Sequence, residues 1–139
     1  MEKIKIKKLS ALLDSWKQDN NGTKKAFSEL YRLLLTKENI DLSFKSRPGV
    51  SHSLRAGVKA GKGKERLLAM IDIIDDDPEN RWLSVCFYAE SITDPKEEGD
   101  IIPGGLLGED GYCFDLFEED DEMVVYLKDR INEAHEKYI

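Results

Sequence analysis

The chain has 139 residues, of which 40% are hydrophobic and 35% are charged, and its formal net charge is −7. This length fits one domain, and the apolar fraction supports a hydrophobic core and argues against intrinsic disorder. No apolar run approaches the roughly 18 residues that span a bilayer, and the charged N-terminal stretch lacks the apolar segment of a secretory signal. The composition predicts a cytoplasmic protein that does not use a membrane.

Two cysteines, Cys86 and Cys113, both sit among apolar and aromatic neighbours. With two cysteines, two histidines and no CxxC spacing, the chain lacks the ligand set of a structural zinc site. Because cytoplasmic reductants oppose disulfides, the sequence predicts two buried free thiols. No motif in the chain predicts a bound cofactor.

The charges are divided unevenly along the chain. Residues 1–66 hold 16 Lys and Arg against 7 Asp and Glu, whereas residues 67–139 hold 5 against 21. Such asymmetry is typical of a nucleic-acid-binding face or an acidic tail. The alternative is that the two halves lie beside each other in one domain and attract, and the sequence leaves both interpretations open.

The N-terminal part, about residues 1–38, predicts a helical hairpin. Apolar residues recur at intervals of three and four over about 2–18, and a second stripe follows over about 23–37 after a break at Asn20-Asn21-Gly22. Two helices joined by a short turn should pack against each other.

From about residue 40 the apolar period changes to two, which is typical of strands. The pattern predicts strands over about 40–45, 50–56, 82–92 and 112–117, and a more continuous apolar run over 66–74 predicts a central strand covered on both faces, all within a sheet region of 39–117. Short connections make neighbouring strands antiparallel. A final amphipathic helix is predicted over about 118–139.

The predicted fold class is α+β, with an antiparallel sheet of about five strands in meander order and with the helical hairpin and the C-terminal helix packed on one face. No repeat, low-complexity tract or linker interrupts the chain, so residues 1–139 are predicted to form a single domain.

The connection 93–111 is the most informative segment, because loops longer than about 12–15 residues are uncommon in compact domains and are often functional. Five of the ten glycines lie between 99 and 111, beside four large aliphatic residues. Each such side chain left in water costs roughly 1.5–3 kcal/mol, so these four either fold back in an Ω-type loop or await a partner. The candidate binding residues are Ile101, Ile102, Gly104, Gly105, Leu106, Leu107, Glu109 and Asp110.

Carboxylates at the mouth of this loop indicate an alternative function. Converging carboxylates can hold Mg²⁺ or Ca²⁺ and can thereby support hydrolysis of a phosphate ester. The candidate ligands, if a metal site exists, are Asp100, Glu109, Asp110 and Asp115.

The segment 45–66 is basic, with seven Lys and Arg and one acidic residue. Its Gly- and Lys-rich stretch 57–64 departs from a phosphate-binding loop in spacing and in the residue after the lysine. Nucleic-acid binding is a second alternative, although the segment has no aromatic side chain on which bases would stack. The candidate anion-binding residues are Arg47, Arg55, Lys59, Lys62 and Lys64.

Neither histidine indicates catalysis. His52 falls on the apolar face of its predicted strand, where we expect a hydrogen-bonded core residue, and its neighbours Ser51 and Ser53 point to the opposite face. His135 is expected at the surface. The spacing predicts no Ser/His/Asp or Cys/His arrangement.

Three stretches, Ser43–Ser51, Trp82–Tyr88 and Pro103–Tyr112, resemble small bacterial α+β proteins of unknown function, over about residues 40–117. The order of helices and strands is also similar to that of frataxin-like and YjbR-like domains. These resemblances imply a fold layout and no catalytic residue.

The leading hypothesis is a non-enzymatic protein-binding or regulatory module that uses the loop 93–111 and the neighbouring sheet face, with a homodimer through the same loop as a variant. The alternatives are a metal-dependent hydrolase that acts on an anionic, phosphate-containing substrate and a nucleic-acid-binding protein that uses the basic segment.

Overall fold

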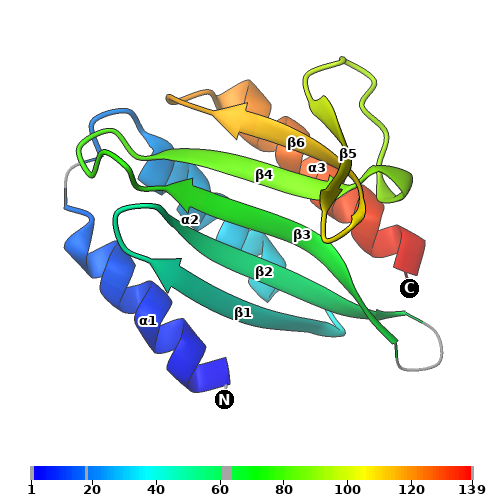
Figure 1. The fold of residues 1–139 in the computed structure, drawn as a ribbon, viewed down its shortest axis with the longest axis horizontal. Coiled ribbons are helices and arrows are strands. Elements are labelled where there is room, and N and C mark those ends of the chain that lie inside the picture. Colours follow the sequence, from blue (N-terminus) through cyan, green and yellow to red (C-terminus); the bar gives the residue numbers. More distant parts are fainter. Residues whose placement is uncertain (1, 18, 61–63, 139) are drawn as a thin grey trace.

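The structure, a computed structural model, describes residues 2–17, 19–60 and 64–138 (Figure 1). The elements in chain order are α1 (Glu2–Ser15), α2 (Thr23–Leu35), β1 (Ile40–Arg47), β2 (Ser51–Ala60), β3 (Lys64–Ile74), β4 (Trp82–Tyr88), a short 3-10 helix η1 (Ala89–Ser91), β5 (Asp100–Leu106), β6 (Glu109–Leu116) and α3 (Asp121–Tyr138). The α+β class and the antiparallel sheet are thereby confirmed.

The six strands form one antiparallel sheet in the order β1-β2-β3-β4-β6-β5. Strands β1 to β4 follow one another as a meander, and β6 then pairs with β4 while β5 takes the outer edge. The number of predicted strands was too small by one, since β5 lies inside the segment 93–111 that the sequence predicted as a loop.

Strand β5 tolerates Pro and Gly because it lies at an edge and is irregular. Its register with β6 shifts between Ile102 and Leu106, so the intervening Pro-Gly-Gly need not supply regular ladder hydrogen bonds. The turn into β6 is a two-residue turn of Leu107 and Gly108, whose φ angles are 51° and 85°. Positive φ at both central residues is typical of the tight primed turns that join twisted strands.

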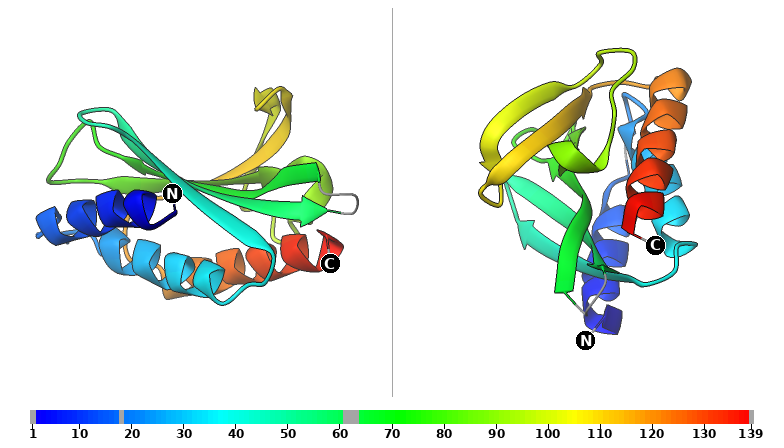
Figure 2. Two further views of the ribbon diagram at one scale, coloured as in Figure 1. Left: turned by 90° about the horizontal axis from the view of Figure 1, so that it is seen from below. Right: turned by 90° about the vertical axis from the view of Figure 1, so that its right-hand side faces the viewer.

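The helices lie on one side of the sheet (Figure 2). Helix α2 packs beside α3, while α1 packs along β1. The most extensive contacts of the first two helices are therefore with β1 and with α3, rather than with each other as their short connection predicted. No helix in the described parts of the chain combines the length and the apolar character needed to cross a membrane.

The hydrophobic core fills the space between the sheet and these helices. The strands supply fully buried side chains such as Ile71, Val85 and Phe87, and the helices add Phe27 and Leu127. The alternating apolar residues of β1 to β4 therefore form the sheet side of the core, and the apolar stripe of α3 forms part of its helix side.

The other side of the sheet, which we call the open face, carries no helix of the described residues. It faces the viewer in Figure 1, and Figure 2 shows that the β5–β6 hairpin curls away from the helices on this side. A second, smaller apolar cluster lies here, and it comprises Leu67, Cys86, Tyr88 and Leu106, with Met70 and Cys113 packed against it.

Cys86 and Cys113 form a disulfide, so the prediction of two free thiols was wrong. The sheet register places the two residues directly opposite each other on β4 and β6, with their Cα atoms 4.1 Å apart. Because 27 residues separate them in sequence, only the strand pairing shows that they meet.

Candidate functional site

The open face is polar along its middle. The register aligns one residue from each of five neighbouring strands in a single row, and this row comprises Lys45, Ser53, Asp72, Ser84 and Asp115. Directly opposed residues on neighbouring strands share one face with side chains about 4.5–5.5 Å apart at Cβ. The row therefore forms a continuous polar strip across the sheet.

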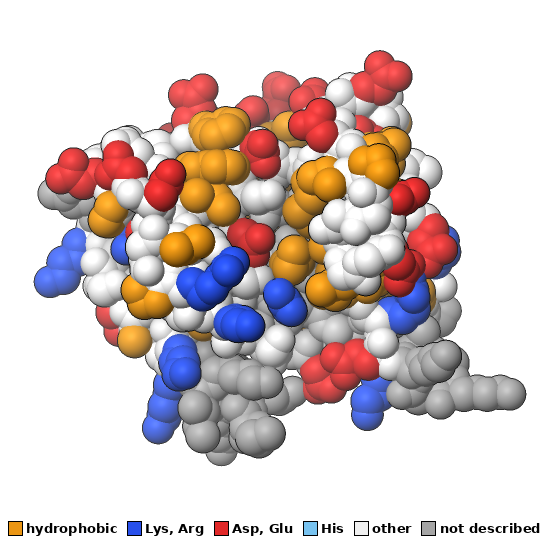
Figure 3. All heavy atoms as spheres, in the orientation of Figure 1, with side chains coloured by type: hydrophobic (Ala, Val, Ile, Leu, Met, Phe, Trp, Pro, Cys, Tyr) orange, Lys and Arg blue, Asp and Glu red, His pale blue; other side chains and the backbone are white. Residues whose placement is uncertain are grey.

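A hollow of about 270 Å³ lies over the first three strands at one end of this row, and we call it the β1–β3 hollow. Its lining residues are Lys45, Arg47, Ser51, Ser53, Arg55, Met70 and Asp72. Three cations and one carboxylate make this lining basic in a protein whose net charge is −7. Figure 3 shows Lys and Arg side chains gathered near the middle of the open face and Asp and Glu side chains most numerous along its upper edge.

Three polar atoms of this hollow are buried without a hydrogen-bond partner: Ser53 Oγ, Arg55 Nε and Asp72 Oδ1. Ser53 is only 9% exposed. Buried polar atoms are nearly always paired in native proteins, and an unpaired one costs roughly 1–3 kcal/mol. The side chains of all three residues line the hollow, and these two donor groups and one acceptor have no hydrogen-bond partner among the described residues.

A second hollow of about 480 Å³ adjoins the first through Arg55, and we call it the hairpin hollow. It lies between the first three strands and the tip of the β5–β6 hairpin, and its lining includes Tyr88, Leu107 and Glu109.

Arg66 fixes the hairpin tip to the rest of the sheet. Its guanidinium lies 3.0 Å from Glu109 and 2.6 Å from Glu90, and it covers the ring of Tyr88 at 4.5 Å. Hydrogen bonds with Glu109 and then with Tyr138 raise the pKa of Arg66 further above its already high value, so this cation is permanent. The wall of the hairpin hollow is therefore held in place by a charged network.

The four aliphatic residues of the segment 93–111 divide into two groups. Leu106 is buried in the apolar cluster of the open face, whereas Ile101, Ile102 and Leu107 are 54%, 42% and 58% exposed. Gly104, with a φ of 64°, and Gly105, which packs beneath Ile102, form the irregular part of β5 that connects the groups. The sequence left open whether these side chains fold back onto the protein or stay exposed. Leu106 folds back, and the other three stay exposed.

The four candidate carboxylate ligands are divided between the two ends of the hairpin. Glu109 binds Arg66, and Asp110 accepts a hydrogen bond of 2.8 Å from the backbone N–H of Gly104. Asp100 and Asp115 lie near the other end, where desolvation and the charge of Asp100 raise the pKa of Asp115. Among the described residues no group of three or more His, Cys, Asp or Glu side chains could hold a metal ion, so the convergence that the hydrolase hypothesis requires is not found.

The candidate anion-binding residues do not all lie in one place. Arg47 and Arg55 line the β1–β3 hollow together with Lys45, whereas Lys59 lies further along β2 and is exposed. Lys62 lies outside the described residues, as does the side chain of Lys64. No aromatic side chain is among the described residues that line this hollow, so it offers no platform on which nucleic-acid bases would stack.

A buried polar cluster surrounds His52 on the helix side of the sheet. Ser46 Oγ lies 2.5 Å from Nδ1, and Asp75 Oδ2 lies 2.7 Å from Nε2. Arg81 donates to the second oxygen of Asp75 at 2.6 Å and lies over the ring of Trp16. A carboxylate only accepts, so Nε2 carries a proton and donates it to Asp75, while Nδ1 shares a hydrogen bond with the Ser46 hydroxyl.

This cluster confirms His52 as a hydrogen-bonded core residue, and it brings together a Ser/His/Asp arrangement that the sequence spacing did not reveal. Burial alone would raise the pKa of Asp75, but the hydrogen bonds from Arg81 and His52 outweigh it and hold the pKa below its usual value. The imidazole is buried and stacks on Phe44, and neither hollow of the open face includes it. We therefore interpret the cluster as structural.

His135 is also buried, so its predicted surface position was wrong. Its Nε2 lies 2.9 Å from the backbone carbonyl oxygen of Glu38, just before β1. The imidazole thereby connects the last turn of α3 to the chain between α2 and the sheet.

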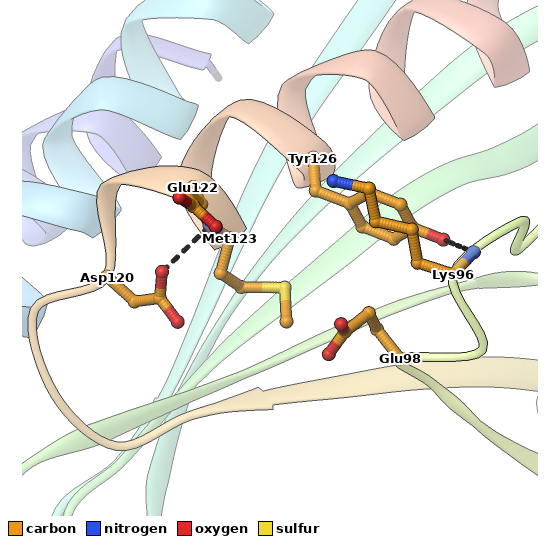
Figure 4. A pocket seen from close by; sticks show the side chains of 6 residues that line it. All are labelled: Lys96, Glu98, Asp120, Glu122, Met123 and Tyr126. Atoms are coloured by element: carbon orange, nitrogen blue, oxygen red, sulfur yellow. Dashed lines mark hydrogen bonds between the residues drawn. The ribbon is translucent and has the colours of Figure 1, made fainter.

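A small hollow of about 70 Å³ lies between α3 and the chain that leads into β5 (Figure 4). Two of its polar side chains are engaged within the protein: the Tyr126 hydroxyl accepts from the backbone N–H of Lys96 at 3.2 Å and donates to Asp94, while Asp120 accepts from the N–H of Met123 at 3.0 Å. These contacts connect α3 to the connection before β5 and leave little space for a ligand.

No protein-family model, no curated protein sequence and no solved structure matches the chain. No family or relative therefore assigns a role to any residue, and the proposed function depends on the open face itself.

Proposed function

We propose that the protein is a non-enzymatic binding module that engages a polypeptide partner on the open face of its sheet, with the β5–β6 hairpin as the main apolar contact. The observation that carries the proposal is the exposure of Ile101, Ile102 and Leu107 on a hairpin that borders a hollow of about 480 Å³. Exposed apolar groups beside a concave surface are typical of protein interaction sites.

The hairpin is well suited to present these side chains. On its inner side, Leu106 packs into the apolar cluster, and the disulfide joins β6 to β4. At its tip, Arg66 holds Glu109. A surface held in this way loses little conformational freedom when a partner binds, which favours affinity.

A second apolar group extends the surface beyond the hairpin. Trp82 and the exposed Phe117 stack at 4.6 Å between ring centroids, near the ends of β4 and β6. Figure 3 shows hydrophobic side chains over the hairpin and, separately, near this other end of the open face. Two apolar groups with a polar strip between them favour an extended partner segment over a compact small molecule.

The test is a selection of peptides from a display library on the wild-type protein, followed by affinity measurements on two variants. Leu107→Lys places a charge on the hairpin and should weaken the selected peptides at least about tenfold, because a charge in an apolar contact must be desolvated. Val125→Lys is the matched control, since Val125 is 56% exposed on α3. Equal affinity for both variants, or failure to select any peptide, contradicts the proposal.

The Leu107→Lys variant also tests whether the protein self-associates through the hairpin. A sedimentation coefficient that rises with wild-type concentration, and that stays constant for Leu107→Lys, would make the partner a second copy of the chain.

A further inference from the structure

We propose that the β1–β3 hollow is a carboxylate-binding site, and that the partner segment is an acidic peptide which places a Glu or Asp side chain there. This inference rests on the proposed function and adds the chemical class of the partner. The β1–β3 hollow adjoins the hairpin hollow through Arg55, and its test is kept separate from the apolar contact by a probe that has no apolar side chain.

The donors of the hollow are arranged for an anion. Ser53 lies opposite Lys45 on β1, Ser51 lies opposite Arg47, and Arg55 follows Ser53 on the same face of β2. Ser53 Oγ and Arg55 Nε are buried and have no hydrogen-bond partner within the described chain. A carboxylate that accepts from both would satisfy them with charge-assisted bonds, which are the stronger kind.

The unpaired hydrogen-bond acceptor in the hollow favours the binding of a peptide over that of other anions. Asp72 lies directly opposite Ser53 on β3, and its Oδ1 is buried without a donor. A peptide supplies a backbone N–H for this oxygen within a few ångströms of its own acidic side chain. Inorganic phosphate in its dianionic form keeps one hydroxyl donor but brings a second negative charge against Asp72, so the lining disfavours it.

The charge of the hollow fits one or two carboxylates. Lys45, Arg47 and Arg55 contribute three positive charges, and Asp72 removes one of them. Elsewhere the chain is acidic, with 28 Asp and Glu against 21 Lys and Arg, so a polyanion such as nucleic acid meets repulsion outside the hollow. A short acidic segment avoids that repulsion.

The probe is an acetylated and amidated hexaglutamate peptide, and the neutral control is the corresponding hexaglutamine peptide. Nitrogen–proton NMR titration of the full chain should show saturable shifts at Ser53, Arg55 and Asp72 with hexaglutamate and none with hexaglutamine. Arg55→Met, which keeps the aliphatic stem and removes the guanidinium, should weaken hexaglutamate binding at least about tenfold. The matched control is Arg32→Met, an exposed arginine in the last turn of α2.

Equal binding to wild type and Arg55→Met, equal shifts with hexaglutamine, or stronger binding of inorganic phosphate than of hexaglutamate would each overturn the carboxylate site. The two proposals fail separately. If Leu107→Lys abolishes binding of selected peptides while Arg55→Met does not, the hairpin surface stands and the carboxylate site falls. A thermal melt of Arg55→Met that matches wild type shows that the variant is folded.

Discussion

Nε2 of His52 donates a hydrogen bond of 2.7 Å to Oδ2 of Asp75, and the two side chains are buried where the first three strands meet α1. The second oxygen of Asp75 accepts from Arg81 at 2.6 Å. A carboxylate from the β3–β4 turn therefore joins an imidazole on β2 to a guanidinium just before β4. This charged group replaces apolar packing at that end of the core, and it makes the local fold depend on ionisation.

Removal of the Asp75 charge should destabilise the protein. In Asp75→Asn the Arg81 guanidinium keeps its burial and loses its counter-charge, and breaking a buried pair in this way costs about 3–5 kcal/mol. Urea denaturation at pH 7 measures the loss. Asp76→Asn, at the exposed next position of the turn, should change the free energy of unfolding by less than about 0.5 kcal/mol. Equal effects of the two substitutions would contradict the assignment.

Acid should weaken the fold through Asp75 and Asp94. Desolvation would raise the pKa of Asp94, but the hydroxyl of Tyr126 and the backbone N–H groups of Gly99 and Glu98 hold it below its usual value, and Arg81 and His52 lower that of Asp75 in the same way. A lowered folded-state pKa stabilises the protein above the unfolded value of 3.8, and this stability is lost as the pH falls through the folded pKa.

The measurement is a series of thermal melts between pH 7 and pH 2. The melting temperature should fall most steeply below about pH 4, and Asp75→Asn should flatten that part of the curve because one of the two titrating groups is gone. Parallel curves for wild type and Asp75→Asn would show that Asp75 does not contribute to the acid sensitivity.

The sequence predicted strands well where one face of the strand is buried. In β1 the buried Phe44 alternates with exposed Lys45, and in β4 Leu83, Val85 and Phe87 face the core, so period two was visible. Strand β5 was missed because almost all of its side chains are exposed and Pro103 and its glycines interrupt it. An edge strand that buries neither face leaves no alternation to detect.

The candidate site was harder to predict, because it depends on strand register. Arg47 and Arg55 were found as basic residues, but Ser53 and Asp72 join them only through the pairing of β2 with β3. Ser46 and Asp75 meet His52 for the same reason, across 6 and 23 residues of sequence. Asp75 is the first of three consecutive aspartates in a turn, and nothing in the sequence indicated that it alone would be buried.

Reduction of the disulfide should destabilise the protein. Cys86 and Cys113 close a loop of 27 residues in sequence separation, for which the chain-entropy relation gives about 3–4 kcal/mol. Urea denaturation with and without a phosphine reductant measures the difference. The double variant with Cys86→Ala and Cys113→Ala should resemble the reduced wild type and should not respond to reductant. A wild type that also does not respond would mean that the two thiols are not paired in solution.

Tyr126 should hold the connection before β5 against α3. Its hydroxyl donates to Asp94, which in turn accepts from the N–H groups of Glu98 and Gly99, so Tyr126→Phe leaves a partly buried carboxylate without one donor. The expected loss is about 1–2 kcal/mol, with faster amide hydrogen exchange at Glu98 and Gly99. Tyr31→Phe removes a hydroxyl from a ring that stacks on Phe27, and it should leave exchange at these two amides unchanged. If both variants exchange there at the wild-type rate, the Tyr126 hydroxyl does not order this segment, and Asp94 alone holds the two amides.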